Sequence, residues 1–381
     1  MTLGDLGADV IKIEPTQGDS SRLSAGPQYK GESSHYLGYN RSKRGITLDI
    51  RTPTGKEAFY DLVKVSDVVW NNYRPGVMKR LGADYETLKR INPRIIFCSI
   101  TGHGPHGPYR DLPSVESVAS GISGIMSVTG EPGGRPIRPG PAMSDTVGGL
   151  YGVIGTLSAL YSREQTGEGQ SVDTSLLGAS VALMAYYIAY YFCSGGTVLG
   201  PLGSGYPMAA PYGALKTKEG YVVVGICWPR IARVVGADWL IDDPRFSTFE
   251  SRLENRWELN EILEEYLQKA TAEEWLELFH AEDIAAGPLN TTDKVVSDPQ
   301  VQHLNMILSI KHALGGEVKL AGNPIMMKGL EGDYLPPPTL GQHTDEVLRD
   351  LLGYSTDKIA KLKEEQQQHA EELEKHVRKK R

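Results

Sequence analysis

Cysteine is scarce in this chain. Its 381 residues include only Cys98, Cys193 and Cys227, which lie far apart and form neither a C-x-x-C pair nor a Cys/His group with zinc spacing. This pattern is typical of a protein that keeps its thiols reduced, and it offers no framework for disulfides or a structural metal. We therefore expect a cytosol-like compartment and no metal site.

Three short motifs of common enzyme classes are also absent. The chain contains no HExxH, no GxxxxGK[ST] and no GxSxG, which argues against a zinc protease, a P-loop ATPase and an α/β-hydrolase. Positive charge is not in excess either, because 40 Lys and Arg stand against 47 Asp and Glu, for a net charge of −7. Such a chain has no general attraction to nucleic acid, and we expect neither DNA nor RNA as a partner.

Long apolar runs are limited to one segment. Residues 176–193 carry no charged side chain and have the length of a membrane span. Gly178, Ser180 and several tyrosines dilute the run, and no second span accompanies it. We therefore predict no membrane association and interpret the run as one helix that is buried on all sides, at a subunit interface.

The stretch Arg138–Gly152, RPGPAMSDTVGGLYG, carries the candidate catalytic residue, Asp145. Pro139 and Pro141 preclude a helix before Met143, and apolar residues recur at helical spacing after it, at positions 150, 154, 157 and 160. Asp145 is therefore expected at or near a helix N-cap. A carboxylate there commonly caps the first N–H groups of the helix, and on this stretch alone capping is the simpler interpretation.

Four glycines follow Asp145 along the same predicted helix, at positions 148, 149, 152 and 155. Each glycine costs roughly 1 kcal/mol relative to alanine inside a helix. We infer that something approaches this backbone closely, either a ligand or another helix.

The first hundred residues have the pattern of a parallel α/β layer, and the length of the chain suits two domains. We expect buried strands at 10–13 and 94–100, an alternating strand at 45–50, a further strand at 67–70, and a helix at 53–65. Cationic side chains stand on loops near the ends of these strands, where ligands bind in open parallel sheets. As a set they favour a phosphate-rich ligand, although each alone is also explained as solvated surface. They are Arg22, Lys43, Arg44, Arg74 and Arg80.

The glycine-rich sequence GHGPHG at 102–107 is a weak dinucleotide fingerprint. Pro105 and Pro108 prevent the helix that such a site needs. His103 and His106 could be metal ligands by residue type, but no third ligand is evident in the sequence. We therefore expect a loop role for both.

The second half of the chain opens with a glycine-rich stretch at 194–207, SGGTVLGPLGSGYP, which we interpret as a domain boundary or lid. Beyond it we expect a strand at 221–226, helices at about 256–270 and 271–281, and a helix at 345–352 after a proline-rich connector. From about Thr356 the charged tail is typical of a solvated helix, and we assign it no chemistry.

A series of stretches, taken in order, resembles the class III (CaiB/BaiF-type) CoA-transferase family. No single motif is decisive, and it is their serial order over nearly the whole chain that makes the resemblance specific. The pattern is most similar to the succinate–hydroxymethylglutarate and formyl-CoA:oxalate branches. The stretches are DLGADVIKIE, GDSSR, NRSKRGITLDI, NNYRPGVMKRLG, INPRIIFCSITGHGPHGPY, SGIMSVTGEP, AMSDTVGGL, TGEGQSVD and PPPTLGQHT.

The resemblance implies an α/β fold with a Rossmann-like large domain, a smaller inserted α/β domain, and two chains interlocked as a homodimer. On this chain it implies a CoA-binding large domain at 1–200, with the family's first strand apparently missing before Met1. A glycine-rich loop and linker follow at 201–212, and the small domain at 213–321. Residues 322–381 then return to the large domain and end in the charged tail.

The resemblance also assigns residues. The family's nucleophilic aspartate falls on Asp145. Its mobile active-site loop falls near 203–207, which gives Gly203, Gly205 and Tyr206 a place at the site; Tyr206 departs from the His or Gln of many relatives. The positions that hold or neighbour the nucleotide and phosphates of CoA fall on Arg22, Lys43, Asn72, Tyr73, Arg74 and Arg80.

The implied activity is CoA transfer from an acyl-CoA thioester to a small carboxylic acid, here a dicarboxylate. An ionised carboxylate needs no base to attack a thioester, and the route runs through an aspartyl mixed anhydride and an aspartyl-CoA thioester. Neither a tightly bound cofactor nor a metal is implied, because CoA enters as part of a substrate. A closing loop keeps water from the anhydride. The resemblance implies a cytoplasmic enzyme, or one of the mitochondrial matrix in a eukaryote.

Two other functions stay open. The α-methylacyl-CoA racemases of the same family pair the equivalent aspartate with the histidine of a GHD motif, which falls here on Ser114, Val115 and Glu116. Val115 replaces that histidine, which favours transfer over racemisation. Glu116 keeps an acid at the third position, and a charge at a helix N-terminus explains it equally well. The second alternative is a truncated paralogue that dimerises without turnover.

Overall fold

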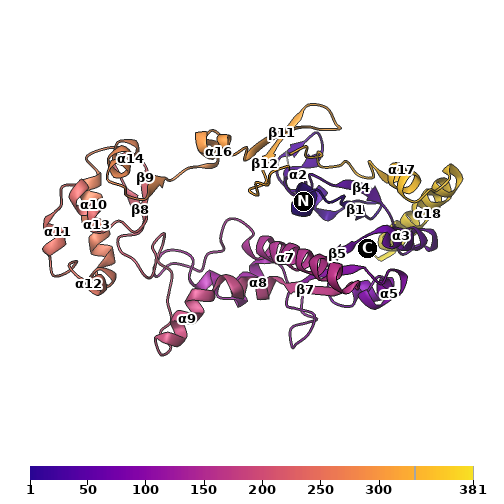
Figure 1. The fold of residues 1–381 in the computed structure, drawn as a ribbon, viewed down its shortest axis with the longest axis horizontal. Helices are drawn as coiled ribbons and strands as arrows, with labels where there is room; N and C mark the ends of the chain where they lie inside the picture. The colour runs from indigo at the N-terminus through magenta and orange to yellow at the C-terminus, as the bar shows by residue number, and fades with distance from the viewer. Residues whose placement is uncertain (330–331, 381) are drawn as a thin grey trace. The chain divides into compact units, whose positions relative to one another are not determined.

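The computed structural model describes residues 1–329 and 332–380 and divides the chain into two compact units. Unit 1 contains Met1–Pro113, Thr146–Leu176 and Val296–Arg381, and unit 2 contains Ser114–Asp145 and Leu177–Val295. Both units mix helices with short sheets (Figure 1), so the expected α/β class is confirmed. The domain limits expected from the sequence stay a prediction.

Unit 1 is built on two parallel sheets. In one sheet, β1 (Ile11–Glu14) pairs with β4 (Arg44–Thr47). In the other, β6 (Ile96–Thr101) lies between β5 (Val68–Asn71) and β7 (Ser171–Ser175). The strands expected in the first hundred residues are therefore confirmed, with their ends shifted. Because the strands are parallel, the loops that follow β5 and β6 lie at the same edge of one sheet.

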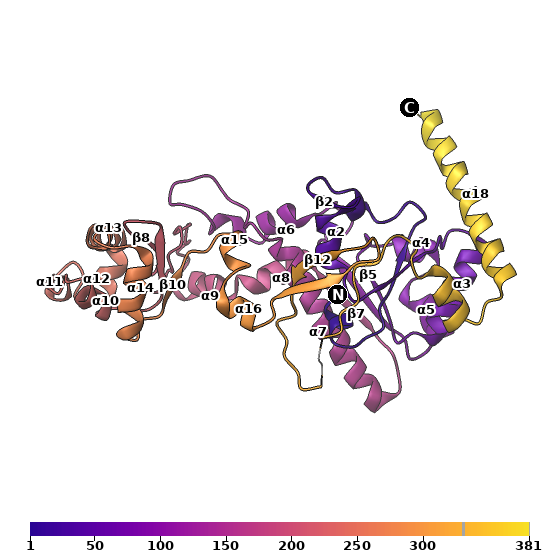
Figure 2. The same cartoon turned by 90° about the horizontal axis from the view of Figure 1, so that it is seen from above.

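Two helices of unit 1 bring distant parts of the chain into one core. Helix α3 (Pro53–Val65) has the limits expected from the sequence, because Pro53 fits the first helical position and Thr52 caps the helix through its side chain. Its buried Leu62 shares a core with Leu362 of α18 (Thr356–Lys380). Figure 2 shows α18 beside α3. The tail is thus a helix as expected, and its first turns are packed rather than fully solvated.

The remaining elements of unit 1 are short. The helix expected at 345–352 appears as one turn of α-helix followed by a π-helical turn. The elements are α1 (Thr2–Asp5), η1 (Ser20–Leu23), β2 (Gln28–Tyr29), β3 (Glu32–Ser33), α2 (Ser34–Tyr39), α4 (Val77–Leu81), α5 (Tyr85–Ile91), α16 (Pro299–His303), β11 (Ile307–Lys311), β12 (Glu317–Ala321), α17 (Thr344–Glu346) and η3 (Val347–Leu351).

Helix α7 (Met143–Thr166) packs against the three-stranded sheet through its glycines. A Cβ atom added to Gly152 would lie 2.8 Å from the ring of Trp70 on β5, and one added to Gly155 would lie 2.5 Å from Val172 Cγ1 on β7. Both distances are too short for a side chain. At these two positions the close neighbour is the sheet, and not the ligand or second helix expected from the sequence.

Unit 2 carries an antiparallel sheet with a continuous apolar core. Its strands β8 (Gly213–Lys216), β9 (Tyr221–Val224) and β10 (Ala286–Pro288) lie in the order β10-β9-β8. Helices α13 (Arg256–Leu267) and α14 (Ala272–Ala281) confirm the two helices expected here. The core includes Leu215, Val222, Ile231, Leu259, Leu263, Leu267 and Phe279.

The apolar run at 176–193 differs from expectation. It forms α8 (Leu176–Leu183) and α9 (Ala185–Cys193), which are bent by 59°. The Met184 N–H donates to Val181 O, a tight turn that breaks the regular ladder. No side chain of α9 is buried, so the prediction of one helix buried on all sides is wrong for this chain by itself. A uniformly apolar run has no periodicity from which a break or a buried face can be read.

Among the described helices, none alone has both the length and the apolar composition of a membrane span, and only the bent pair α8 and α9 taken together meets that test. The other elements of unit 2 are short. They are α6 (Glu116–Ile122), η2 (Ile125–Ser127), α10 (Arg230–Val234), α11 (Trp239–Asp242), α12 (Phe249–Glu254) and α15 (Thr292–Val295).

Candidate active site

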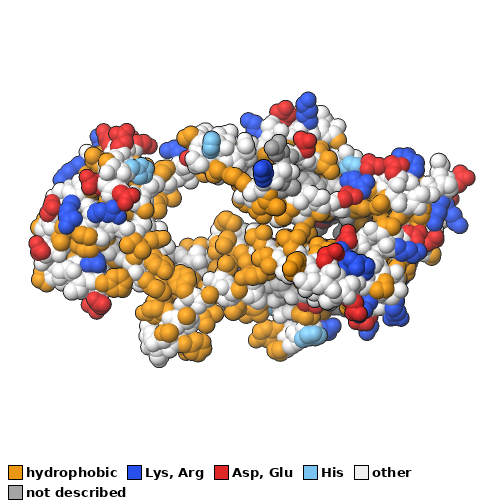
Figure 3. All heavy atoms as spheres, viewed as in Figure 1, with side chains coloured by type: hydrophobic (Ala, Val, Ile, Leu, Met, Phe, Trp, Pro, Cys, Tyr) orange, Lys and Arg blue, Asp and Glu red, His pale blue; other side chains and the backbone are white. Residues whose placement is uncertain are grey.

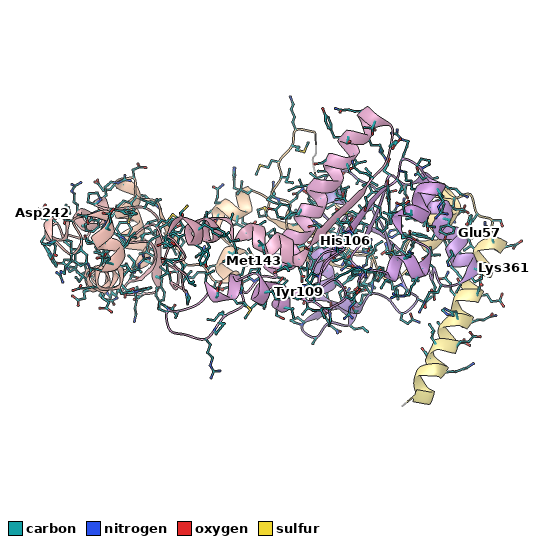
Figure 4. The ribbon with its side chains drawn as sticks, turned by 90° about the horizontal axis from the view of Figure 1, so that it is seen from below. Glu57, His106, Tyr109, Met143, Asp242 and Lys361 are labelled. Carbon is teal, nitrogen blue, oxygen red and sulfur yellow. The ribbon has the colours of Figure 1, made fainter. Side chains whose placement is uncertain are left out.

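Asp145 lies in the first turn of α7. The helix begins at Met143, which is labelled in Figure 4, so Pro139 and Pro141 stop it where the sequence predicts. Asp145 is the third residue of the helix, and its side chain is exposed. The positive end of the helix dipole favours a negative charge at this position and also a developing oxyanion beside it.

A second carboxylate holds the backbone of this turn. Glu116 Oε2 accepts a hydrogen bond of 2.9 Å from the Asp145 N–H, and Glu116 Oε1 accepts one of 2.9 Å from Ser120 Oγ. Ser120 Oγ lies 3.0 Å from Ser144 Oγ, and both serines are fully buried. Glu116 thus caps α7 from another segment of unit 2. Sequence reasoning noted Glu116 but missed Ser120 and Ser144; the four-residue spacing of Glu116 and Ser120 was the available signal.

Exposed side chains follow β5 at the carboxyl edge of the three-stranded sheet. Asn72, Tyr73 and Arg74 stand in this loop, and Arg80 stands on α4. The preceding Asn71 is buried and fixes the loop, because its side chain accepts a hydrogen bond of 3.3 Å from the Tyr73 N–H and donates one to Cys98 O. Neither Arg74 nor Arg80 forms an ion pair with a described residue, and their role toward CoA stays a prediction.

Lys43 is half-buried just before β4. Its ammonium group donates to Tyr39 O at 3.0 Å and to Asn40 Oδ1 at 2.9 Å. Burial, assisted by the positive charge of Lys12, lowers the pKa of Lys43 to about 8. The side chain is therefore mostly charged at neutral pH but close to losing its proton.

Arg22 has a different setting from the other predicted cations. It pairs with Glu14 at 2.7 Å and with Glu32 at 2.8 Å, and its side chain is 8% exposed. It also donates to Tyr36 Oη at 2.6 Å and to Pro338 O at 3.1 Å. Every nitrogen atom of the guanidinium group thus has a protein acceptor. In this conformation Arg22 supports the fold of the loop after β1, and its role toward CoA stays a prediction.

The glycine-rich segment 203–207 is tied to the body of unit 2. The Gly203 N–H donates to Gly130 O at 2.8 Å, and Gly203 has a φ of +59°. The Ala214 N–H donates to Ser204 Oγ at 2.8 Å. Sequence reasoning expected a mobile loop here; in this structure the segment is hydrogen-bonded at its start.

Two of the three thiols are poor nucleophiles. Burial raises the pKa of Cys98 to about 11 and that of Cys227 to about 12. The described residues contain no cluster of three or more His, Cys, Asp and Glu side chains that could hold a metal. His103, in the loop after β6, lies edge-on to Tyr109 with ring centres 5.8 Å apart. The exposed carboxylate of Asp145 is thus a better candidate for nucleophilic chemistry than these thiols.

A family model described as CoA-transferase family III matches residues 1–344 of the chain. A succinyl-CoA:glutarate CoA-transferase of Homo sapiens is 37% identical over 368 residues, which cover 95% of this chain and 84% of that protein. A succinate–glutarate CoA-transferase of Agrobacterium fabrum is 33% identical over 361 residues, which cover 92% of this chain and 90% of that protein.

Among solved structures, a CaiB/BaiF family protein from Brucella suis has a similar fold. The TM-score is 0.81 at 34% sequence identity, and the match covers 92% of this chain and 93% of that one. The likeness therefore extends over both compact units.

Proposed function

The chain belongs to CoA-transferase family III and is a CoA-transferase, and from this premise we propose that it moves CoA from succinyl-CoA to a dicarboxylate such as glutarate. The names of similar proteins support this pair of substrates. Besides the two glutarate enzymes, they include an acetyl-CoA:oxalate transferase of Acetobacter aceti and a succinyl-CoA–L-malate transferase subunit of Chloroflexus aurantiacus. In this reaction CoA is part of a substrate and not a resident cofactor.

The observation that carries the proposed mechanism is the exposed carboxylate of Asp145 on a helix turn whose backbone Glu116 holds. An Asp145 oxygen attacks the thioester carbonyl, the C–S bond breaks, and CoA leaves as thiolate from a mixed anhydride. The thiolate attacks the aspartyl carbonyl and releases the first acid, which gives an aspartyl-CoA thioester. The acceptor carboxylate then repeats both steps in reverse and restores the free aspartate.

Unit 1 supplies the positive charges for the CoA end of the substrate. We assign Lys43, Asn72, Tyr73, Arg74 and Arg80 to its nucleotide and phosphates. The three cations among them form no ion pair with a described residue, so each can bind an anion without first breaking an ion pair. Arg22 belongs to the same proposed set, although its own donors are bound to protein groups. The loop with Gly203, Gly205 and Tyr206 is proposed to border the acyl group.

The Rossmann-like large domain and the interlocked homodimer are also part of the proposal. An exposed apolar row on α7 supports a second chain, since Leu150, Ile154, Leu157 and Tyr161 are 44%, 58%, 44% and 72% exposed. Figure 3 shows hydrophobic side chains gathered over this helix. We place the enzyme in the cytoplasm, or in the mitochondrial matrix of a eukaryote, which suits its three free thiols.

The test of this function is an acceptor panel. Purified protein receives succinyl-CoA with glutarate, oxalate, malate or citramalate, and new acyl-CoA is separated by chromatography. We expect at least one dicarboxylate to accept CoA. Failure of all four would overturn the dicarboxylate proposal. The racemase alternative predicts solvent deuterium at the α-carbon of a 2-methylacyl-CoA, and a silent paralogue predicts a folded protein that does not retain CoA.

A further inference from the structure

Arg256, the first residue of α13, is bound to the glycine-rich segment of unit 2. Its Nη1 donates to Tyr206 O at 3.0 Å and its Nη2 to Pro207 O at 3.4 Å. Its Nε donates to Leu253 O at 3.0 Å, so all three nitrogen atoms bind main-chain carbonyl groups. No carboxylate of the described residues forms an ion pair with Arg256, so its guanidinium group is bound by main-chain carbonyl groups alone within the described hydrogen bonds. A guanidinium group suits this contact because its planar fork spans two neighbouring oxygen atoms.

The side chain of Tyr206 is held independently of this contact. Its ring meets Tyr186 edge-on at 5.8 Å and Tyr212 in a tilted arrangement at 5.3 Å between ring centres. Such aromatic pairs stabilise the ring in this orientation. The Tyr206 hydroxyl group has Met208 Sδ at 3.9 Å, and a thioether is only a weak acceptor. The ring is thus fixed while its hydroxyl group can still donate to a better acceptor.

We propose that Arg256 is a positioning residue for the acceptor site. It holds the carbonyl groups of Tyr206 and Pro207 in one arrangement, so that the Tyr206 ring forms a wall of the site and offers its hydroxyl group to the carboxylate of the acceptor. This inference rests on the proposed function and deepens it, because it names the residues that direct CoA to the acceptor carboxylate and keep the aspartyl-CoA thioester from reacting with water.

Two reactions compete for the aspartyl-CoA thioester. In transfer, an acceptor oxygen attacks the aspartyl carbonyl, the C–S bond breaks, and the departing thiolate then attacks the acceptor carbonyl of the new anhydride. In hydrolysis, water attacks the same aspartyl carbonyl, the C–S bond breaks, and the products are the aspartate carboxylate, the CoA thiol and one proton. A site that orients a carboxylate and excludes water favours transfer.

The experiment compares wild type with Arg256→Gln and Arg256→Lys. Each protein receives succinyl-CoA and glutarate, and the ratio of glutaryl-CoA to free CoA is measured by chromatography. In Arg256→Gln we expect this ratio to fall about tenfold and the KM for glutarate to rise, while the KM for succinyl-CoA stays unchanged. Arg256→Lys keeps the positive charge but not the planar guanidinium group, so we expect its ratio of glutaryl-CoA to free CoA to lie between those of wild type and Arg256→Gln.

Arg252→Gln is the matched control. Arg252 also donates to a main-chain carbonyl, Phe246 O at 2.9 Å, and burial lowers the pKa of both guanidinium groups. It does not contact residues 203–207 within the described hydrogen bonds, and we expect the wild-type ratio. If the circular dichroism signal shows that Arg256→Gln does not fold, Tyr212→Leu replaces it in the test. This variant removes a neighbour of the Tyr206 ring, and we expect the same fall in the ratio of glutaryl-CoA to free CoA.

Three outcomes decide the inference. A fall in the ratio that Arg252→Gln does not share supports it. An active wild type with unchanged ratios in folded Arg256→Gln and Tyr212→Leu overturns the inference and leaves the proposed function intact. A wild type that transfers CoA from succinyl-CoA to none of the four acids overturns both.

Discussion

Two buried arginines of unit 1 and two partly buried arginines of unit 2 have different kinds of partner. In unit 1, Arg22 pairs with Glu14 at 2.7 Å and Arg41 pairs with Asp5 at 2.7 Å, and all four side chains are 8% exposed or less. In unit 2, Arg252 and Arg256 donate instead to main-chain carbonyl groups. Arg22 and Arg41 are thus neutralised inside unit 1, and we assign the binding of an anionic substrate to other cations. Arg252 and Arg256 of unit 2 hold backbone segments, and neither forms an ion pair with a described residue.

The largest expected difference between these arginines is in the free energy of unfolding. Arg22→Met leaves Glu14 buried without its partner, and we expect a loss of about 3–5 kcal/mol in the free energy of unfolding, measured in urea. Arg252→Met removes hydrogen bonds to carbonyl groups and should cost only about 1–2 kcal/mol. A variant Arg22→Met with the wild-type free energy of unfolding and a raised KM for succinyl-CoA would contradict this contrast, because Arg22 would then bind CoA directly.

The next effect concerns catalysis in unit 2. Glu116→Ala removes the acceptor of the Asp145 N–H and that of the buried Ser120 hydroxyl group, and a buried donor left unsatisfied costs about 1–3 kcal/mol. We expect kcat to fall by about 10-fold to 100-fold while the KM for succinyl-CoA changes little. Glu116→Gln keeps an acceptor oxygen and should retain more of the rate. A raised KM with an unchanged kcat would mean that Glu116 binds substrate and does not position Asp145.

The exposed cations of unit 1 should show the opposite kinetic pattern. Arg74→Gln and Arg80→Gln each remove one charge that we assign to the phosphates of CoA, and we expect the KM for succinyl-CoA to rise about tenfold with kcat preserved. The effect should weaken at high salt. Arg233→Gln, on an exposed face of unit 2, is the control and should match wild type. A fall in kcat alone would contradict the division of roles between the two units.

The smallest effect is a pH dependence at Lys43. Burial and the Lys12 charge lower the pKa of Lys43 from 10.5 to about 8, so the side chain loses its charge as the pH rises through 8. Phosphate monoesters have a second pKa near 6 and are already fully charged there. We expect the KM for succinyl-CoA to rise about threefold between pH 7 and 9. In Lys43→Met the KM should be raised and flat over this range, and an equal rise in both proteins would exclude Lys43 as its source.

Local signals made parts of the fold predictable. The start of α3 follows from Thr52 and Pro53, and the start of α14 follows from the capping box of Thr271 and Glu274, because each signal acts within four residues. The start of α7 at Met143, which puts Asp145 in its first turn, follows from two nearby prolines. The candidate nucleophile was therefore accessible to sequence reasoning.

Long-range partners were not accessible. Arg22 and Arg74 look alike in the sequence, yet Arg22 binds Pro338 O, 316 positions away, while Arg74 stands exposed. No local pattern distinguishes a cation that is neutralised inside the protein from one that faces solvent. Arg256 was missed for the same reason, since its contact with Tyr206 spans 50 positions. Ion pairs and backbone contacts of this kind become visible only in the folded chain.

The most direct test of the account is whether Asp145 carries the acyl and CoA groups covalently. Wild type and Asp145→Asn are incubated with succinyl-CoA, with and without hydroxylamine as a trap, and analysed by intact-protein mass spectrometry. The account predicts a CoA-sized adduct or an Asp145 hydroxamate on wild type, and neither on the variant. Equal adducts on both proteins, or none on an active wild type, would contradict it and leave Asp145 as a helix-start carboxylate without covalent chemistry.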